Sequence, residues 1–271
     1  ESCISFTPEI VFIVKGVTIK PSTLKFIKAK GIKSISWSND DMYGWHNRSL
    51  WYTLGLKQYD LVVTQKSYNC NQDELPSLGA KTFFQNKAFE PKVHYPVKSC
   101  DTYTCVHDVV FVGAMEEDRL AQLIYLAQND IKVHIYGWVK EVKNVIHSNL
   151  IFHNRFLFEE EFSAALGCSK ISLNFLRKIN RDLQTSRSIE IPAVNGFMLA
   201  ERTDEHMQLF EEGKEAEFFS SKEELLQKVQ YYLQHDTERL AIAKAGYDRC
   251  FKDNYTFENR MQGILNNLFN V

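Results

Sequence analysis

Short apolar runs alternate with amphipathic helical patterns along most of the chain, and this alternation restricts the folds that it can adopt. Apolar runs of this length are typical of buried strands, whereas the longer segments between them repeat apolar residues at the spacing of a helix. Strands that alternate with helices predict parallel sheets covered by helices, which is an α/β fold. The predicted strands are residues 10–14, 34–37, 61–64, 81–84, 108–112, 132–136, 150–153, 170–175, 197–201 and 216–219.

An aperiodic stretch divides this alternation into two groups of strands. Residues 91–104 contain two prolines and no periodic apolar pattern, which is typical of a linker. We therefore predict an N-terminal domain over residues 1–97, a second domain over residues 98–256, and a final helix over residues 257–271 near the domain junction. The first domain lacks the opening strand and glycine-rich turn of a complete nucleotide-binding domain, so we expect it to be truncated or reduced.

Composition and missing motifs exclude two classes of protein. The 271 residues are 44% hydrophobic with a formal net charge of −2, which suits two modest globular domains. No run of about eighteen apolar residues is present, so the sequence predicts no transmembrane helix. The single Gly113 after a predicted strand is not a GxGxxG fingerprint, which argues against a nicotinamide-dependent dehydrogenase.

Basic residues are concentrated in the N-terminal part of the chain. Residues 1–100 carry 13 Lys and Arg against 8 Asp and Glu, whereas residues 101–271 carry 19 against 26. Six lysines lie between Lys15 and Lys33. Two interpretations remain open: a solvated helix surface, or a basic face that contacts anionic lipid or an anionic acceptor. Aromatic residues are too sparse among these lysines for a nucleic-acid platform, so we expect no nucleic-acid partner.

The six cysteines form no CxxC pair and no Cys/His zinc spacing. Cys100 and Cys105 are close enough in sequence to raise the alternative of a disulfide. Nothing else indicates a secreted disulfide framework, so we interpret the cysteines as scattered thiols of a cytoplasmic protein.

Residues 182–219 carry charged side chains where a packing helix would carry apolar ones. Ser186, Arg187 and Glu190 lie within about one helical turn of each other. A helix N-terminus and a guanidinium both suit a phosphate, and a nearby carboxylate can accept hydrogen bonds from a sugar diol. The segment therefore predicts a pocket for a nucleotide-diphosphate sugar. An N-cap for Ser186, a salt bridge for Arg187 and a surface position for Glu190 are the structural alternatives.

This segment also resembles the C-terminal signature of CgeB-type, group 1-like glycosyltransferases. The resemblance implies the GT-B fold, in which two Rossmann-like domains carry parallel sheets. It rests on residues 187–193, Gly196, residues 201–203, residues 209–215, Tyr232, Leu233, His235, Arg239, Ala243 and Gly246, with weaker upstream similarity at residues 38–41 and 59–64.

The resemblance implies donor-binding roles for several residues. Glu190 takes the place of the second carboxylate of a spaced acidic pair, which binds the donor ribose in this group. Asp182, eight residues earlier, takes the first place, where the family has Glu. Arg119 is similar to a basic residue that reaches the diphosphate, with an exposed helix charge as the alternative, and Arg155 falls where the nucleobase sits. Gly113 is expected beside the ligand because open α/β sheets bind ligands at the carboxyl ends of their strands.

The acceptor is expected on the N-terminal domain. An inverting transferase needs a general base within reach of the acceptor hydroxyl, and Asp41 and His46, after the second predicted strand, are the candidates. A retaining transferase of this fold needs none, and an Asx turn is the alternative for residues 39–41. No acidic cluster resembles the DxD motif of metal-dependent transferases, so we expect no catalytic metal and no cofactor.

The sequence thus predicts a metal-independent glycosyltransferase of polysaccharide biosynthesis. It would move a sugar from a nucleotide-diphosphate donor to a cell-surface glycan or protein acceptor, in the cytoplasm or at the inner face of the membrane. Two alternatives are a non-catalytic nucleotide- or sugar-binding protein of an envelope or spore layer, and a nucleotide-sugar epimerase of the same architecture.

Overall fold

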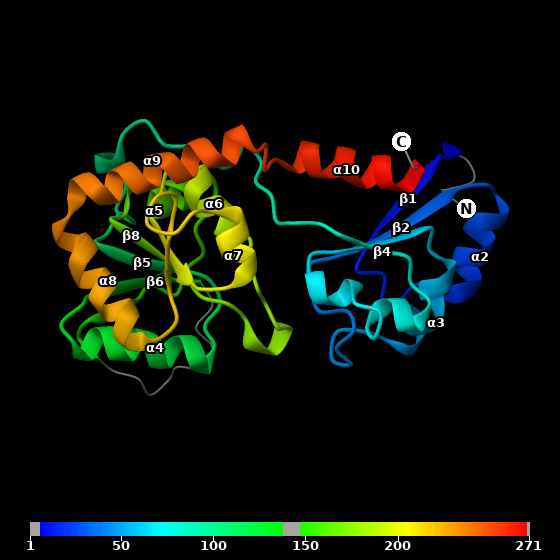
Figure 1. Ribbon diagram of the computed structural model, residues 1–271, viewed down its shortest axis with the longest axis horizontal. Helices are drawn as coiled ribbons and strands as arrows, with labels where there is room; N and C mark the ends of the chain where they lie inside the picture. The colour runs from blue at the N-terminus through cyan, green and yellow to red at the C-terminus, as the bar shows by residue number, and fades with distance from the viewer. Residues whose placement is uncertain (1–5, 138–146, 270–271) are drawn as a thin grey trace. The chain divides into compact units, whose positions relative to one another are not determined.

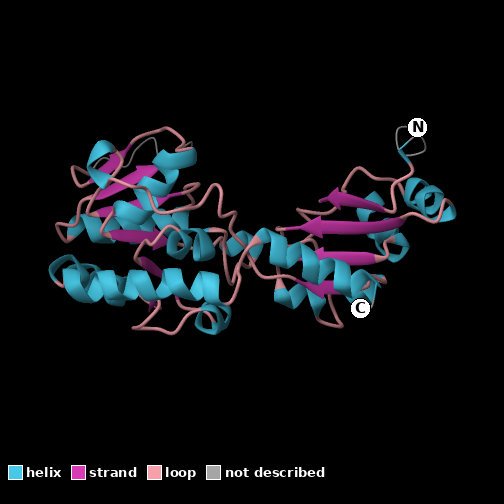
Figure 2. Cartoon of the chain, turned by 90° about the horizontal axis from the view of Figure 1, so that it is seen from above, coloured by secondary structure: helices cyan, strands magenta, loops and turns pink. Residues whose placement is uncertain are grey.

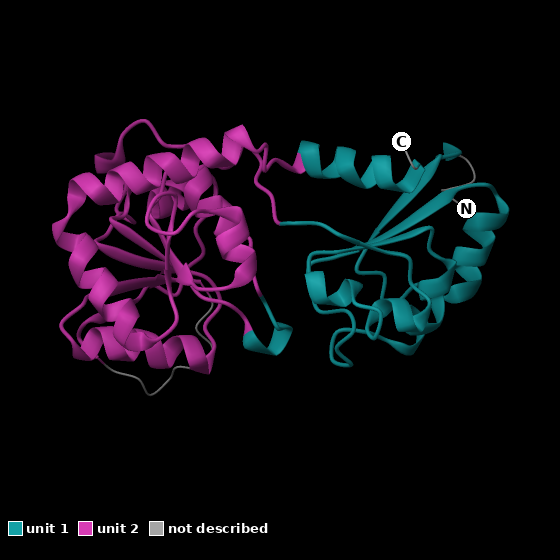
Figure 3. Ribbon diagram, in the orientation of Figure 1, with its two compact units in different colours: residues 1–86, 178–182, 258–271 teal, residues 87–177, 183–257 magenta. Residues whose placement is uncertain are grey.

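The computed structural model describes residues 6–137 and 147–269, which form two compact α/β units (Figure 1). Unit 1 comprises Glu1–Asn86, Lys178–Asp182 and Glu258–Val271, and unit 2 comprises Lys87–Arg177 and Leu183–Phe257 (Figure 3). Each unit contains one parallel sheet, which confirms the predicted fold class. The boundary expected at residues 97–98 lies inside unit 2, and the final helix belongs to unit 1 apart from its first residue.

Unit 1 is a four-stranded parallel sheet between two layers of helix. The strand order is β1-β2-β3-β4, with Ile35 of β2 opposite Phe12 of β1 and Leu61 of β3. Its strands and α-helices are β1 (Ile10–Val14), α2 (Pro21–Ala29), β2 (Lys33–Ser38), α3 (Leu50–Gly55), β3 (Leu61–Thr64), β4 (Thr82–Phe84) and α10 (Phe257–Phe269).

The two faces of this sheet bury different helices because side chains alternate along each strand. Val62 of β3 packs with Leu24 of α2 and Tyr52 of α3 on one face. Leu61 and Val63 point to the other face, where α10 supplies apolar residues such as Ile264. Figure 2 shows α10 running across the strands of this sheet. The last helix therefore completes the core of the unit that begins the chain.

Unit 2 is a six-stranded parallel sheet in the order β10-β9-β8-β5-β6-β7. Helices α5 and α6 pack on one face and α4 and α8 on the other. Its elements are β5 (Val109–Val112), α4 (Glu117–Gln128), β6 (Val133–Tyr136), β7 (Leu150–Phe152), α5 (Glu159–Cys168), β8 (Ile171–Asn174), α6 (Arg187–Ala193), β9 (Met198–Glu201), α7 (Asp204–Leu209), β10 (Glu217–Phe219), α8 (Lys222–Gln234) and α9 (Asp236–Lys252).

The strand order of unit 2 places a topological switch point at β5. The chain runs outward from β5 through β6 to β7, then returns to the other side of β5 to form β8, β9 and β10. Loops that leave the carboxyl ends of β5 and β8 therefore diverge and open a crevice, which is where such sheets bind ligands. The fold thus directs attention to the residues that follow β5, β6 and β8.

The cysteines differ from the expectation of free thiols. Cys100 forms a disulfide with Cys168, at the end of α5 and 68 residues away, and not with Cys105. Cys105 is buried and its thiol donates a hydrogen bond to the Glu161 carbonyl at 3.3 Å. Sequence proximity was the wrong criterion because the bond joins segments that only the tertiary fold brings together.

Candidate donor site in unit 2

A hollow of about 180 Å³ lies at the carboxyl ends of β5 and β6 in unit 2. It is smaller than the 300–1,000 Å³ typical of a pocket for a whole drug-sized ligand, so the hollow itself encloses only part of a nucleotide sugar. The hollow is lined by Val112, Gly113, Ala114, Tyr136, Gly137, Phe156, Leu157, Phe162 and Arg187.

Two glycines let the backbone approach itself closely at the floor of this hollow. Gly137 follows β6 with φ of 128°, a conformation that other residues rarely adopt. A Cβ at this position would lie 2.3 Å from the Gly113 carbonyl oxygen, so any side chain would force the two strand ends apart. A Cβ at Gly113 would itself approach the Phe111 ring at 2.9 Å. Gly113 thus lies at the hollow, as predicted from its place after the strand, and Gly137 is an equally constrained neighbour.

Arg187, the first residue of α6, contributes a guanidinium to the hollow. Its Nε donates a hydrogen bond to the Val112 carbonyl at 3.0 Å, and its Nη1 pairs with Glu190 one turn later. The guanidinium lies over the Phe162 ring, 4.5 Å from the centroid. Nη2 has no protein partner among the described residues. The arrangement presents an oriented donor group to an anion in the hollow.

Glu190 also faces His94, which sequence reasoning had assigned only to the linker. The His94 Nδ1 accepts a hydrogen bond from the Glu90 backbone N–H at 3.0 Å, so Nε2 carries the proton of the neutral ring. That Nε2 lies 3.7 Å from a Glu190 carboxylate oxygen. Burial lowers the pKa of His94 despite the opposing effect of Glu190. His94, Arg187 and Glu190 therefore form one cluster, and no motif in the sequence indicated the first of them.

A buried hydrogen-bond network fixes the segment that leads into α6. His206 donates from Nδ1 to the Glu201 carbonyl at 2.6 Å, so its Nε2 accepts from the Ser188 hydroxyl at 2.7 Å. The Ser188 oxygen in turn accepts from the Thr185 backbone N–H and the Asn174 side chain. Burial lowers the pKa of His206 to about 4, so the ring is neutral and able to accept. This network sets the position of the turn that carries Arg187.

The other predicted donor residues take different places in unit 2. Ser186 occupies the N-cap position of α6, but its hydroxyl makes no capping hydrogen bond; the Ser188 hydroxyl accepts from the turn instead. Arg155 lies beside the hollow, 5.4 Å from the Tyr136 ring centroid, and pairs with Glu161. Arg119 is buried, and its guanidinium donates to three carbonyls: those of Ala114, Phe175 and Leu176. It joins two loops of the crevice and is not an exposed helix charge.

Asp182 belongs to unit 1, where it forms a buried ion pair with Lys66 and accepts a hydrogen bond from Asn180 at 2.9 Å. The buried charge of Lys66 is thereby compensated, since an unpaired ammonium in the interior would be costly. The ion pair attaches residues 178–182 to the N-terminal unit. Asp182 and Glu190 therefore lie in different units.

Asp41 is buried in unit 1 and holds the same segment. Its carboxylate receives two hydrogen bonds from Arg181, at 2.7 and 2.9 Å, one from Asn69, and two from the backbone of the following turn. Burial raises the pKa of Asp41, but the hydrogen bonds from Arg181 and Asn69 outweigh it and leave the pKa below its usual value. This is the Asx turn that sequence analysis kept as the alternative. His46 is exposed and contacts Asn47 at 3.1 Å. Catalytic roles for Asp41 and His46 remain predictions.

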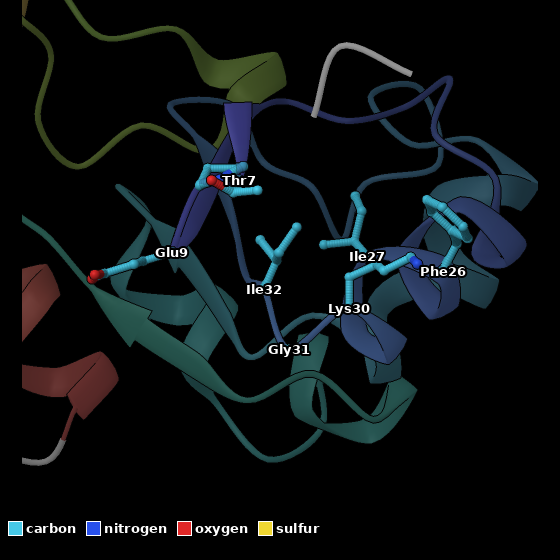
Figure 4. A pocket seen from close by; sticks show the side chains of 8 residues that line it. Thr7, Glu9, Phe26, Ile27, Lys30, Gly31 and Ile32 are labelled. Carbon is cyan, nitrogen blue, oxygen red and sulfur yellow. The ribbon is translucent and has the colours of Figure 1, made fainter. Parts of the chain in front are cut away.

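A larger cavity of about 310 Å³ lies in unit 1, between the start of β1 and the end of α2 (Figure 4). It is lined mainly by apolar groups, including Phe26, Ile27 and Ile32, with Lys30 at its edge. It lies at the amino ends of the strands, the edge opposite to the one that binds ligands in open α/β sheets. We therefore do not assign the donor to it.

Comparison with known proteins identifies the family. A family model described as "Glycosyl transferase-like" matches residues 115–266, which is more than half of the chain. The chain belongs to this glycosyltransferase family. The match includes Arg187 and Glu190, but it begins after Val112, Gly113 and Ala114, which also line the hollow of unit 2. It confirms the predicted group 1-like enzyme class, although nothing in it distinguishes the CgeB type. No curated protein matches the chain by sequence.

Solved structures of low sequence identity share the GT-B fold of this glycosyltransferase. Anabaena HepE in complex with UDP-glucose matches with a TM-score of 0.69 and 11% identity, over 97% of this chain and 79% of that one. Sucrose-phosphate synthase from Thermosynechococcus elongatus matches with a TM-score of 0.68 and 10% identity, over 99% and 75%. S. aureus TarM, solved with UDP and α-GlcNAc-glycerol, matches with a TM-score of 0.64 and 15% identity, over 93% and 54%.

Among the described residues, no helix is both long and apolar enough to cross a membrane.

Proposed function

We propose that this glycosyltransferase binds a nucleotide-diphosphate sugar in the hollow of unit 2 and transfers the sugar to a glycan or protein acceptor of the cell surface. The observation that carries the proposal is the Arg187–Glu190 pair beside Gly113 and Gly137, at the carboxyl ends of β5 and β6. A diphosphate needs cationic donors, and a ribose diol needs a carboxylate. The pair supplies both within one helical turn. The UDP-sugar and UDP complexes of HepE and TarM support the same class of donor.

Each group in the hollow has a distinct task in the proposed reaction. The guanidinium of Arg187 would bind the diphosphate and stabilise the charge that grows on it as the glycosidic bond breaks. The carboxylate of Glu190 would accept hydrogen bonds from the ribose diol, and the exposed ring of Phe156 would pack against the base. The proposed chemistry uses Arg187 in place of a catalytic metal ion, and it includes no cofactor.

We also propose that unit 1 contacts an anionic membrane surface. Leu50, Trp51 and Leu54 of α3 are 68%, 45% and 48% exposed, an unusual density for six residues of helix. Helix α2 packs beside α3 and bears exposed lysines such as Lys25, and Lys20 lies 5.9 Å from the Trp51 ring centroid. Apolar side chains beside lysines are typical of surfaces that bind anionic lipid.

Vesicle sedimentation tests this membrane contact. We expect binding to vesicles that contain anionic lipid, weaker binding to neutral vesicles, and loss of binding in high salt. The double variant Trp51→Ser, Lys25→Glu should lose the binding, whereas the control Lys222→Glu in unit 2 should keep it. Equal binding of the parent to anionic and neutral vesicles would contradict the proposal.

The proposed function includes a cytoplasmic location. In the reducing cytoplasm we expect Cys100 and Cys168 to be present as free thiols, which thiol labelling of cells can show.

An activity assay separates transfer from the two alternatives. The purified chain is incubated with UDP-, GDP-, ADP-, CMP- and dTDP-sugars, with and without candidate acceptor glycans, and the released nucleotide is measured. We expect nucleotide release that an acceptor accelerates. Conversion of the sugar without any acceptor would indicate an epimerase. Tight binding with no turnover under any condition would indicate a binding protein. In that case Arg187→Lys would have no effect on turnover, because the parent would already lack it.

A further inference from the structure

Three histidines from neighbouring strands of unit 2 meet outside the donor hollow. His107 precedes β5, His134 lies in β6, and His153 follows β7, and β6 pairs with both of the other strands. One ring nitrogen from each of them lies within 4.8 Å of the other two, and all three side chains are half-buried. Because parallel pairing fixes the three strands against each other, this convergence is a property of the sheet.

The hydrogen bonds of the cluster show what its imidazoles can do. The Nδ1 of His134 lies 3.0 Å from the Nε2 of His153, so one nitrogen donates and the other accepts. The two rings cannot both be imidazolium, because they would then present N–H to N–H. Burial, together with the neighbouring histidines, lowers the pKa of His107 to about 4, and burial also lowers the pKa of His134 and His153. Neutral imidazole is the form that binds metal ions.

We propose that His107, His134 and His153 form a binding site for one divalent transition-metal ion, with Zn²⁺ as the expected occupant. Two nitrogens bound to one tetrahedral Zn²⁺ at about 2.0–2.1 Å are about 3.3–3.4 Å apart. The His134–His153 nitrogens, at 3.0 Å, need to separate by only a few tenths of an ångström for an ion to bind between them, and the proton that they share moves to the other nitrogen of the donating ring, so both ligands stay neutral. Three neutral nitrogen ligands suit Zn²⁺, Co²⁺ and Ni²⁺ better than Mg²⁺ or Ca²⁺.

The third ligand requires one rearrangement. The rings of His107 and His134 are stacked with centroids 3.4 Å apart and planes at 18°, whereas two ligands of one tetrahedral ion do not lie face to face. The ring of His107 therefore turns out of the stack on binding. Its Nε2 lies 2.8 Å from the Tyr136 hydroxyl. If Nε2 donates to this hydroxyl, Nδ1 is left to bind the ion. Metal-bound histidines usually make such a hydrogen bond with their other ring nitrogen.

The site is distinct from the donor hollow but touches it through Tyr136. The Tyr136 ring lines the hollow and also stacks on His153, with centroids 4.1 Å apart and planes at 1°. None of the three histidines lines the hollow itself. We therefore infer a structural ion that fixes the strands β5, β6 and β7, and not a Lewis acid for the transfer.

Calorimetric titration of the chelator-treated full chain with Zn²⁺ tests the site. We expect one ion per chain, a rise in Tm with Zn²⁺ concentration, and visible absorption bands of tetrahedral Co²⁺ when Co²⁺ is used instead. The variants His134→Gln and His153→Gln should each weaken Zn²⁺ binding at least about tenfold. The matched control His235→Gln, on an exposed histidine between α8 and α9, should bind as the parent does.

A second measurement is independent of the folding of the variants. Diethylpyrocarbonate modifies accessible histidines, and mass spectrometry of the parent should show that Zn²⁺ protects His107, His134 and His153 but not His235. An aromatic ladder without metal affinity would show no protection and no Tm shift. Absence of saturable Zn²⁺ binding, or binding that both glutamine variants retain in full, would overturn the proposal. Neither result depends on whether the chain transfers a sugar.

Discussion

Acid should weaken this protein through His206, the histidine that accepts a hydrogen bond from Ser188 in the network before α6. Burial lowers the pKa of His206 from 6.5 to about 4 in the folded chain. Between these values the unfolded chain binds the proton and the folded chain does not, so stability falls as the pH decreases from about 6.5 to about 4. At 1.36 kcal/mol per pKa unit, the loss at pH 4 is about 3 kcal/mol.

Urea unfolding of the parent and of His206→Gln, measured from pH 7.5 to pH 4, isolates this contribution. Protonation of other buried histidines also destabilises the folded chain in acid. The contribution of His206 is therefore the difference between the pH profiles of the parent and the variant. We expect the variant to be less stable at pH 7.5, because it loses one side of the network, but to have a flatter profile by about 3 kcal/mol. His235→Gln removes an exposed histidine and should keep the parent's slope. Parallel profiles for the parent and His206→Gln would refute the assignment.

Three further changes probe other parts of the structure. Gly137→Ala should abolish donor binding and lower the Tm, because its Cβ would lie 2.3 Å from the Gly113 carbonyl, whereas Gly263→Ala, where a Cβ meets nothing within 4 Å, should raise the Tm slightly. Cys168→Ser should lower the free energy of unfolding by about 2–4 kcal/mol in non-reducing buffer, since the disulfide closes a loop of 68 residues. A reductant added to the parent should have the same effect, and an unchanged free energy of unfolding in both experiments would contradict the pairing. Asp41→Asn should lower the free energy of unfolding by about 1.5–3 kcal/mol because charge-assisted hydrogen bonds to Arg181 are weakened, whereas His46→Ala should leave it unchanged. Equal stability of Asp41→Asn and the parent in urea would count against a stabilising role for Asp41.

Much of the fold followed from sequence because each strand carries its own local signal. The apolar runs at Ile10–Val14 and Leu61–Thr64 are strands with those same bounds, and the other eight predicted strands are also present. Ser221 caps α8, because its hydroxyl oxygen accepts from the Glu224 backbone N–H at 3.1 Å, a local contact typical of serine at this position. These features depend on neighbours within a few residues, so a single sequence determines them.

Long-range pairings could not be inferred in this way. The Cys100–Cys168 bond, the Lys66–Asp182 ion pair and the transfer of residues 178–182 to unit 1 join segments far apart in sequence. A local pattern carries no information about which buried partner a charge or thiol will meet. The same reason explains why Arg119 is a buried bridge between loops and why the sequence did not indicate His94.

The signature that led to the family is largely structural in the folded chain. Arg202 pairs with both Glu212 and Glu224, and the Thr203 hydroxyl accepts from the His206 backbone N–H at the start of α7. Gly246 packs against the Glu215 carbonyl, which a Cβ would approach within 2.3 Å. These residues hold the end of the sheet together. The signature therefore combines the two residues of the proposed donor site, Arg187 and Glu190, with residues that only stabilise the fold.

The central claim is that Glu190 and Arg187 bind the donor, and calorimetric titration with the tightest-binding nucleotide sugar of the panel tests it most directly. Glu190→Ala removes charge-assisted hydrogen bonds to the ribose, of order 1.5–3 kcal/mol, so affinity should fall roughly ten- to a hundredfold. Arg187→Ala should lower turnover more than affinity, because the diphosphate gains charge as the glycosidic bond breaks. The control Glu223→Ala, on the exposed face of α8, should bind as the parent does. If Glu190→Ala binds the nucleotide sugar with the parent's affinity while remaining folded, the donor site lies elsewhere.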